Sequence, residues 1–274
     1  MRSILLLASL AGALSAAPAL EIVKPVISQM EGGAPDPSGF DHVPGEILFF
    51  SCRIANYTKS PEEKIHVAYS VQAFDPKGVP LTEIYKNEFT DEVGPQDKEW
   101  MPKIATEVAI PPLVGSGAYK IVVHAEDLLA KTKTELSVPF QVRGREVPPS
   151  ETLVVRNFNF YPREEATQPL EKPVFHTGGS LWARFDITGF KYGEQNKIDV
   201  GSQISILGAS GKVLWTQPEP AAEQTTSFYP KRYISGTFNI GLETVKPAQY
   251  TLLVTVKDAV GQQTFEFKQN FTVE

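Results

Sequence analysis

The sequence contains a single cysteine, Cys52, among 274 residues. No disulfide can form within one chain, which excludes the disulfide-rich class of small secreted domains. The chain has fewer basic than acidic residues, with 26 Lys and Arg and 32 Asp and Glu, and its formal net charge is −6. A general nucleic-acid-binding protein would carry a basic surface, so we expect no nucleic acid as a partner. No long apolar run follows residue 20, which excludes a polytopic membrane protein.

The one apolar run of the chain lies at its N-terminus. Arg2 precedes an apolar stretch from Ile4 to Leu14, and the small residues of Ala17-Pro18-Ala19 follow. A basic start, a short apolar core and small residues at the cut are typical of a secretory signal peptide. The sequence therefore predicts a signal peptide at residues 1–19 and a mature chain from Leu20. We expect a secreted or periplasmic protein with no membrane span after cleavage.

The remainder of the chain repeats itself. Residues 119–142 align without a gap on residues 250–273, at a constant offset of 131 residues, and residues 45–81 match residues 178–214 at an offset of 133. Two copies with so long a period indicate a duplicated domain, because solenoid repeats are shorter. The sequence predicts domain 1 at 20–143, a linker at 144–150 and domain 2 at 151–274. Because the linker is short, we expect it to form a semi-rigid elbow.

Both copies carry the alternating pattern of β-strands. In the first copy Ile65, Val67, Tyr69 and Val71 alternate with polar or small residues. The segment Asp75-Pro76-Lys77-Gly78 then has the residues of a tight turn. The pattern predicts an all-β chain of two tandem β-sandwich domains formed by internal duplication.

Each copy resembles an immunoglobulin-like or macroglobulin-type extracellular β-sandwich. The motifs that carry the resemblance are Pro44-Gly45-Glu46, an apolar second strand, a glycine turn and Gly117-Ala118-Tyr119. In immunoglobulin domains a tyrosine near the start of a late strand hydrogen-bonds back to an upstream loop. The resemblance implies this role for Tyr119 and Tyr250. Ile121 and Leu252 stand where the immunoglobulin disulfide cysteine would lie, so that disulfide is absent.

Three single residues have competing interpretations. Cys52 alternates with polar neighbours on the apolar side of its strand, which favours a buried core thiol over a reactive or interchain one. Asp127 and Asp258 each lie eight residues after the repeated tyrosine. We expect both carboxylates to accept backbone N–H groups in a hairpin turn, with calcium binding as the alternative.

Signatures of catalysis are poor. The four histidines, His42, His66, His124 and His176, show no metal-ligand spacing, and no nucleophile elbow or phosphate-binding glycine loop occurs. We therefore expect a protein that is not an enzyme and that needs no cofactor or metal ion.

Two sets of residues are candidates for binding. The acidic segment 83–99 forms a predicted loop that could meet a basic partner or a cation. Its candidate contacts are Glu88, Asp91, Glu92 and Asp97. Phe49 and Trp182 occupy equivalent positions that point away from the predicted cores. They are either ligand platforms or side chains covered by the long loop and the domain elbow.

The sequence as a whole favours an exported, non-catalytic interaction or structural module. Its predicted partner is an unidentified extracellular protein or envelope polysaccharide that contacts the loops of the sandwiches, and the oligomeric state is left open. A secreted protease inhibitor is the alternative, with Pro95–Pro102 and Pro218–Pro230 as candidate loops. A carbohydrate-binding module and a periplasmic chaperone are two further possibilities.

Overall fold

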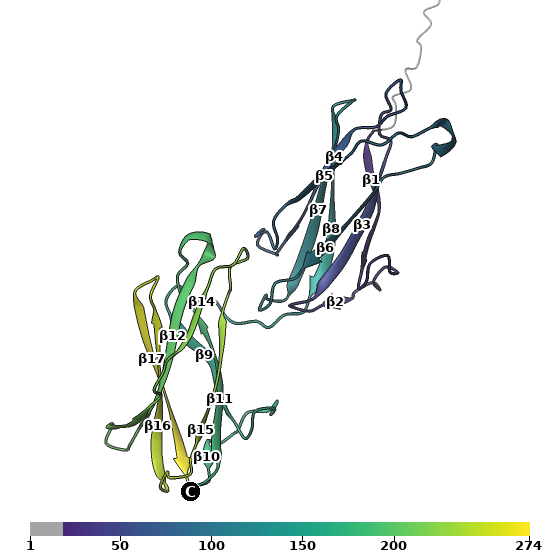
Figure 1. Ribbon diagram of the computed structural model, residues 1–274. Helices are drawn as coiled ribbons and strands as arrows, with labels where there is room; N and C mark the ends of the chain where they lie inside the picture. The colour runs from purple at the N-terminus through teal and green to yellow at the C-terminus, as the bar shows by residue number, and fades with distance from the viewer. Residues whose placement is uncertain (1–18) are drawn as a thin grey trace, which may run out of the picture.

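The computed structural model describes residues 19–274, and these residues form an all-β protein (Figure 1). The predicted signal peptide lies outside the described residues except for Ala19. Two single-turn 3-10 helices, η1 (Pro95–Asp97) and η2 (Glu194–Asn196), interrupt the strands. Within residues 19–274, no helix has the length and apolar character needed to cross a membrane.

The N-terminal half folds into two facing sheets. The first sheet has the strand order β1-β3-β6 and the second has the order β2-β8-β7-β4-β5. The strands of the first sheet are β1 (Glu21–Ser28), β3 (Ile47–Ala55) and β6 (Lys103–Ala109). Those of the second are β2 (Asp41–His42), β4 (Val67–Phe74), β5 (Tyr85–Phe89), β7 (Gly117–Asp127) and β8 (Thr132–Val142).

The C-terminal half has the same layout. Its sheets have the orders β9-β11-β15 and β10-β17-β16-β12, with β13 and β14 both pairing with β12 at the edge. The first sheet consists of β9 (Val154–Tyr161), β11 (Ser180–Thr188) and β15 (Ile234–Gly241). The second consists of β10 (Val174–Phe175), β12 (Ile198–Leu207), β13 (Val213–Thr216), β14 (Ala221–Thr225), β16 (Ala248–Asp258) and β17 (Gln263–Val273).

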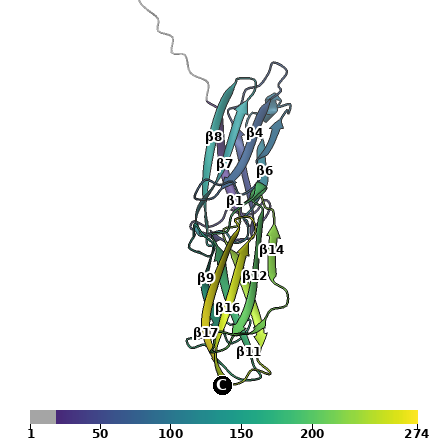
Figure 2. The ribbon, with the colours of Figure 1, turned by 90° about the vertical axis from the view of Figure 1, so that its left-hand side faces the viewer.

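The two sandwiches lie end to end in an elongated molecule (Figures 1 and 2). Each encloses its own cluster of buried apolar side chains between its two sheets. The alternation seen in the sequence explains these cores, because every second residue of β3, β4 and β7 points between the sheets. The apolar inner faces, buried from water, supply the main stabilisation of both halves.

Cys52 lies in the N-terminal core, as its strand pattern predicted. Its side chain is buried, and it is a free thiol. Burial raises the pKa of the Cys52 thiol to about 12. The thiol is therefore protonated and unreactive at neutral pH.

The tyrosine hydrogen bond that the immunoglobulin resemblance implied is present in both sandwiches. The Tyr119 hydroxyl donates to the carbonyl oxygen of Gly115 at 2.8 Å, and the Tyr250 hydroxyl donates to that of Lys246 at 2.7 Å. Each tyrosine thus fixes the turn that leads into its own strand, β7 or β16.

Asp127 accepts backbone N–H groups, as predicted. Its Oδ1 accepts from Leu129 at 2.9 Å and from Ala130 at 3.0 Å, and its Oδ2 accepts from Thr58 at 2.6 Å. Burial opposes ionisation of this carboxyl, but the hydrogen bonds outweigh it and hold the pKa of Asp127 below its usual value. The carboxylate therefore joins the β7–β8 turn to the segment that follows β3.

Asp258 likewise accepts backbone N–H groups in the second sandwich. Its Oδ1 accepts from the backbone of Val260 at 3.1 Å and Gly261 at 3.0 Å, while its Oδ2 accepts from that of Lys191 at 2.8 Å. Both aspartates are buried. The prediction that both carboxylates accept backbone N–H groups in a hairpin turn is therefore confirmed.

Two segments that the sequence indicated as loops are partly strand. The acidic segment 83–99 contains the edge strand β5, which pairs antiparallel with β4 from Tyr85 to Phe89. The segment Pro218–Pro230 contains β14, which pairs with β12. Its Tyr229 is buried in the N-terminal core cluster. The candidate inhibitor loop Pro218–Pro230 is therefore part edge strand and part buried turn, and its role stays a prediction.

Candidate binding site between the two sandwiches

The segment between the sandwiches is held closely by the N-terminal half. The Ser116 hydroxyl donates to the carbonyl oxygen of Gly144 at 2.8 Å. A Cβ atom on Gly144 would lie 2.1 Å from the carbonyl oxygen of Val114, so only glycine fits this position. The backbone N–H of Arg143 donates to His42 at 2.8 Å. The chain thus leaves the first sandwich in a defined direction.

Arg145 ties the same segment to the second sandwich. Its Nη2 lies 2.6 Å from Oδ2 of Asp186, a fully buried carboxylate on β11. Asn157 donates to the same oxygen at 2.8 Å, and the Ser235 hydroxyl donates to Oδ1 at 3.2 Å. Asp186 therefore accepts hydrogen bonds from three side chains, one of them charged, which offsets the cost of burying its charge.

A second contact runs directly between the two sandwiches. Asp75, in the turn after β4, accepts backbone N–H groups of Lys77 and Val79 through Oδ1, both at 2.8 Å. Its Oδ2 accepts the hydroxyl of Tyr229 at 3.0 Å and Nη2 of Arg232 at 2.9 Å. Burial raises the pKa of Tyr229, so this hydroxyl remains a donor. We call the trio Asp75, Tyr229 and Arg232 the interdomain latch.

A cleft of about 820 Å³ opens beside the latch. Both sandwiches and the connecting segment line it. The tyrosine and arginine side chains in its wall are Tyr119, Tyr192, Tyr229, Tyr233, Arg145 and Arg232. Tyr192 is the most accessible of these tyrosines at 40% exposed, whereas the other three are buried. A ligand in the cleft would thus meet one exposed tyrosine ring and two guanidinium groups, whereas the three buried tyrosines offer it little surface.

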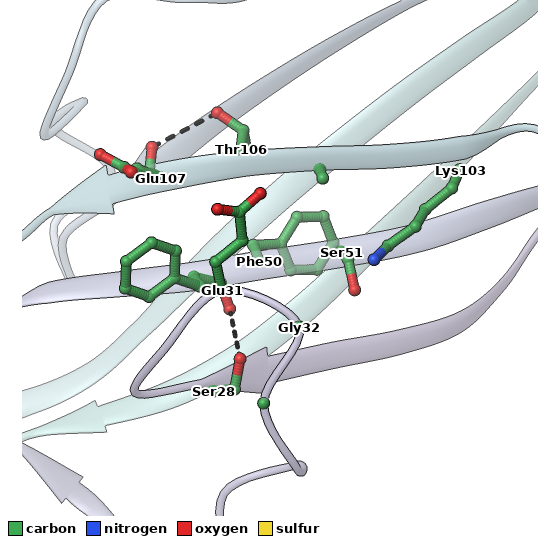
Figure 3. A pocket seen from close by; sticks show the side chains of 11 residues that line it. Ser28, Glu31, Gly32, Phe50, Ser51, Lys103, Thr106 and Glu107 are labelled. Carbon is green, nitrogen blue, oxygen red and sulfur yellow. Dashed lines mark hydrogen bonds between the residues drawn. The ribbon is translucent and has the colours of Figure 1, made fainter.

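Phe49 lies at a different place. It belongs to β3, is half-buried, and lines a groove of about 190 Å³ on the outer face of the first sheet. Figure 3 shows the groove between Ser28–Gly32 on one side of β3 and Thr106 and Glu107 of β6 on the other. We call this the Phe49 groove. The segment beside the ring is thus the β1–β2 connection, not the acidic segment or the elbow.

Trp182 is the counterpart of Phe49 on β11. It is half-buried and lies opposite Tyr161 of β9 and Asn239 of β15. The equivalence of the two aromatic positions follows from their equal places in β3 and β11. They belong to different sandwiches, so they do not form one site.

The four acidic candidates are exposed at the edge of the other N-terminal sheet. Glu88 is on β5 and its carboxylate lies 3.0 Å from Nε2 of His66. Asp91 and Glu92 follow β5, and Asp97 ends η1. Because β5 and β3 belong to different sheets, the acidic residues and Phe49 do not converge.

Comparisons with known proteins give one similar solved structure and no family. No protein-family model matches the sequence. No curated protein matches it either. Among solved structures, the chain is similar to the C-terminal domain of the Streptococcus agalactiae AgI/II polypeptide BspA, with 10% identity and a TM-score of 0.33. The match covers 92% of this chain and 100% of that one. The all-β assignment of this chain rests on its own strands.

The interdomain cleft was missed by the sequence analysis. Its walls come from six separate segments that no local pattern brings together, because the latch joins residues more than 150 positions apart. One signal was available in Asp75, because the C-terminal sandwich has Gly208 in place of an aspartate at the equivalent position of its turn. Because the other sandwich forms this turn without an aspartate, the turn alone does not explain Asp75.

Proposed function

We propose that this chain is an exported, non-catalytic interaction module that receives a protruding segment of an extracellular protein in its interdomain cleft. The observation that carries the proposal is the composition of the cleft, which presents the exposed Tyr192 ring and two arginines beside three buried tyrosines. Tyrosine and arginine are enriched among the residues that dominate binding energy at protein interfaces. A cleft held open before binding also lowers the entropic cost of association.

The interdomain latch supports this proposal because it holds both walls of the cleft. Asp75 has all four of its hydrogen bonds within the protein, and Tyr229 is packed into the core of the opposite sandwich. Separation of the sandwiches would exchange two donors of the Asp75 carboxylate for water, at a net cost of about 1.5–3 kcal/mol for each lost hydrogen bond to this charged group. The cleft is therefore a preformed feature of the free protein.

We also propose that the two sandwiches are domains 20–143 and 151–274, joined by the linker 144–150 and derived by internal duplication. Matching strand orders and matching Asp and Tyr hydrogen bonds support this origin. Phe49, Trp182 and the acidic set Glu88, Asp91, Glu92 and Asp97 are proposed as secondary contact surfaces outside the cleft. Export rests on the predicted signal peptide.

The test is partner capture with two matched tyrosine variants. Tyr192 in the cleft and Tyr85 on β5 are 40% and 41% exposed, so Tyr192→Ala and Tyr85→Ala remove similar surface. We expect an immobilised Tyr192→Ala chain to lose a stoichiometric protein that the wild type and Tyr85→Ala retain from an extracellular fraction. The loss in affinity should be about tenfold or more, as for a central interface tyrosine.

Two outcomes would contradict the proposal. Equal capture by both variants would place the contact outside the cleft. Capture of a polysaccharide in place of a protein, again dependent on Tyr192, would keep the site but assign it to a carbohydrate-binding module.

A further inference from the structure

His42 is an ionisable residue inside the first sandwich. Its side chain is 2% exposed, and the rings of Phe40 and Phe140 meet it edge-on with centroids 5.0 and 5.8 Å away. A carboxylate faces each ring nitrogen. Asp36 Oδ2 lies 3.4 Å from Nε2, and Glu46 Oε1 lies 3.3 Å from Nδ1. The imidazole therefore sits between two acids in an apolar surrounding.

The second sandwich shows that the fold does not require this arrangement. His42 pairs with Val142 in the parallel β2–β8 ladder, and Phe175 pairs with Val273 in the β10–β17 ladder. Phe175 is therefore the counterpart of His42. Its ring packs in the core against Phe160 and Phe271.

The two acids also lack acidic counterparts. The backbone N–H of Asp36 donates to the carbonyl oxygen of Ile27, as that of Leu170 donates to Phe160, so Leu170 takes the place of Asp36. Glu46 directly precedes β3, and Gly179 directly precedes β11. The polar trio of one sandwich is thus Leu, Phe and Gly in the other.

Hydrogen bonding in the trio is incomplete. Within residues 19–274, Asp36 Oδ2 and His42 Nδ1 are buried side-chain atoms that lack a hydrogen-bond partner. A neutral imidazole carries one N–H and can donate to one carboxylate, whereas the protonated ring carries two. Only the protonated ring can hold Asp36 and Glu46 together. A buried polar atom without a partner is costly, so the protonation state matters to this region.

Other contacts around the ring do not change its charge balance. On β2 itself, Asp41 is exposed to solvent. From β8 the ring meets Phe140, and the exposed Arg143 contributes its backbone N–H to the carbonyl oxygen of His42. Among the described residues, Asp36 and Glu46 are the charged groups that form ion pairs with His42.

Asp36 lies in the segment 29–40 that connects β1 to β2. Glu31, Gly32 and Gly33 of this segment form one wall of the Phe49 groove (Figure 3). Residues 35–40 form one wall of a second cleft of about 330 Å³ that His42 also lines. A change in the contact between His42 and Asp36 would therefore alter both the Phe49 groove and this second cleft.

We propose that His42 is a pH-operated clamp on the segment 29–40. The protonated ring donates to Asp36 and Glu46 at once and fixes the segment against β2. Loss of the proton removes one of these donors, and the segment loosens beside the Phe49 groove. The clamp is therefore closed while the ring carries two N–H donors and released when it carries one.

Amide hydrogen exchange of the whole chain tests the proposal, with rates divided by the intrinsic rate at each pH. The equivalent segment 162–173 serves as the internal control, because Arg184 holds it through the carbonyl oxygens of Ala166 and Glu164. An arginine keeps its charge across this pH range. Between about pH 5.5 and pH 8 we expect protection of 29–40 to fall about tenfold, the effect of one charged hydrogen bond. Protection of 162–173 should stay constant.

A double variant sharpens the result. His42→Phe with Asp36→Leu installs the residues of the second sandwich, and we expect exchange of 29–40 to become independent of pH. Equal pH dependence of the two segments in the wild type would overturn the proposal, and so would pH dependence that persists in a folded double variant. The wild-type comparison decides the matter if that variant does not fold.

Discussion

The two sandwiches have one strand order and one set of backbone anchors, yet their cores differ in chemistry. In the C-terminal core a cluster of phenylalanines fills the space between the sheets, and Phe175 and Phe185 belong to it. The N-terminal core has His42 and Cys52 at the matching positions. The anchors that recur are therefore those the fold requires, whereas positions that differ are free to carry another role.

The largest difference in the free energy of unfolding is expected between substitutions at the equivalent positions Phe185 and Cys52. Phe185→Ala removes a large buried ring and should lower the free energy of unfolding by about 3–5 kcal/mol. Cys52→Ala removes one sulfur atom and should cost about 1 kcal/mol. Chemical unfolding of the full chain, followed by a probe in each sandwich, measures both values. Equal losses would show that the two positions do not play the same part in the two cores.

Substitution of the equivalent aspartates, Asp127 and Asp258, should lower the stability of the two sandwiches by similar amounts. Asp127→Ala and Asp258→Ala each leave three backbone N–H groups without their acceptor, so we expect a loss of about 3 kcal/mol or more in the affected sandwich. Asp127→Asn keeps one carbonyl acceptor and should cost less. Calorimetry of the full chain provides the measurement. A marked loss at one site and none at the other would break the equivalence of the two turns.

The tyrosine hydrogen bonds offer a smaller and symmetric test. Tyr119→Phe and Tyr250→Phe each remove one hydroxyl donor to a turn carbonyl. We expect each change to lower the free energy of unfolding by about 1 kcal/mol. Denaturant titration of the two variants and the wild type checks this, and no loss in either would mean that the turns hold without the bond.

The smallest expected effect is the pH dependence of the stability that the Asp127 carboxylate contributes. Because its folded pKa lies below the usual value, its charge contributes stability above about pH 4, and this contribution is lost as the pH falls through the folded pKa. The stability gap between wild type and Asp127→Asn should therefore be widest near neutral pH and shrink in acid. Unfolding curves at about pH 7 and about pH 3 measure the gap, and a constant gap would contradict this assignment.

Local sequence patterns predicted much of the fold but little of the cleft. Alternation placed Cys52 inside, and the repeated Tyr and Asp residues predicted the two anchors, because each of these depends on neighbours along one strand or turn. The burial of Tyr229 in the opposite sandwich depends on packing between distant segments, which no local pattern encodes. His42 could have been singled out by its alignment with Phe175, since an ionisable residue at a core position is unusual.

The interdomain latch fixes the two sandwiches relative to each other and so holds the cleft open before any partner binds. A distance measurement between spin labels tests it directly, with labels at the equivalent exposed positions Ser137→Cys on β8 and Lys268→Cys on β17. The buried, protonated Cys52 should stay unlabelled. We expect one narrow distance distribution in the otherwise wild-type chain, and a broad one when Arg232→Ala removes a donor to Asp75. A distribution that is already broad with the latch intact would contradict the claim.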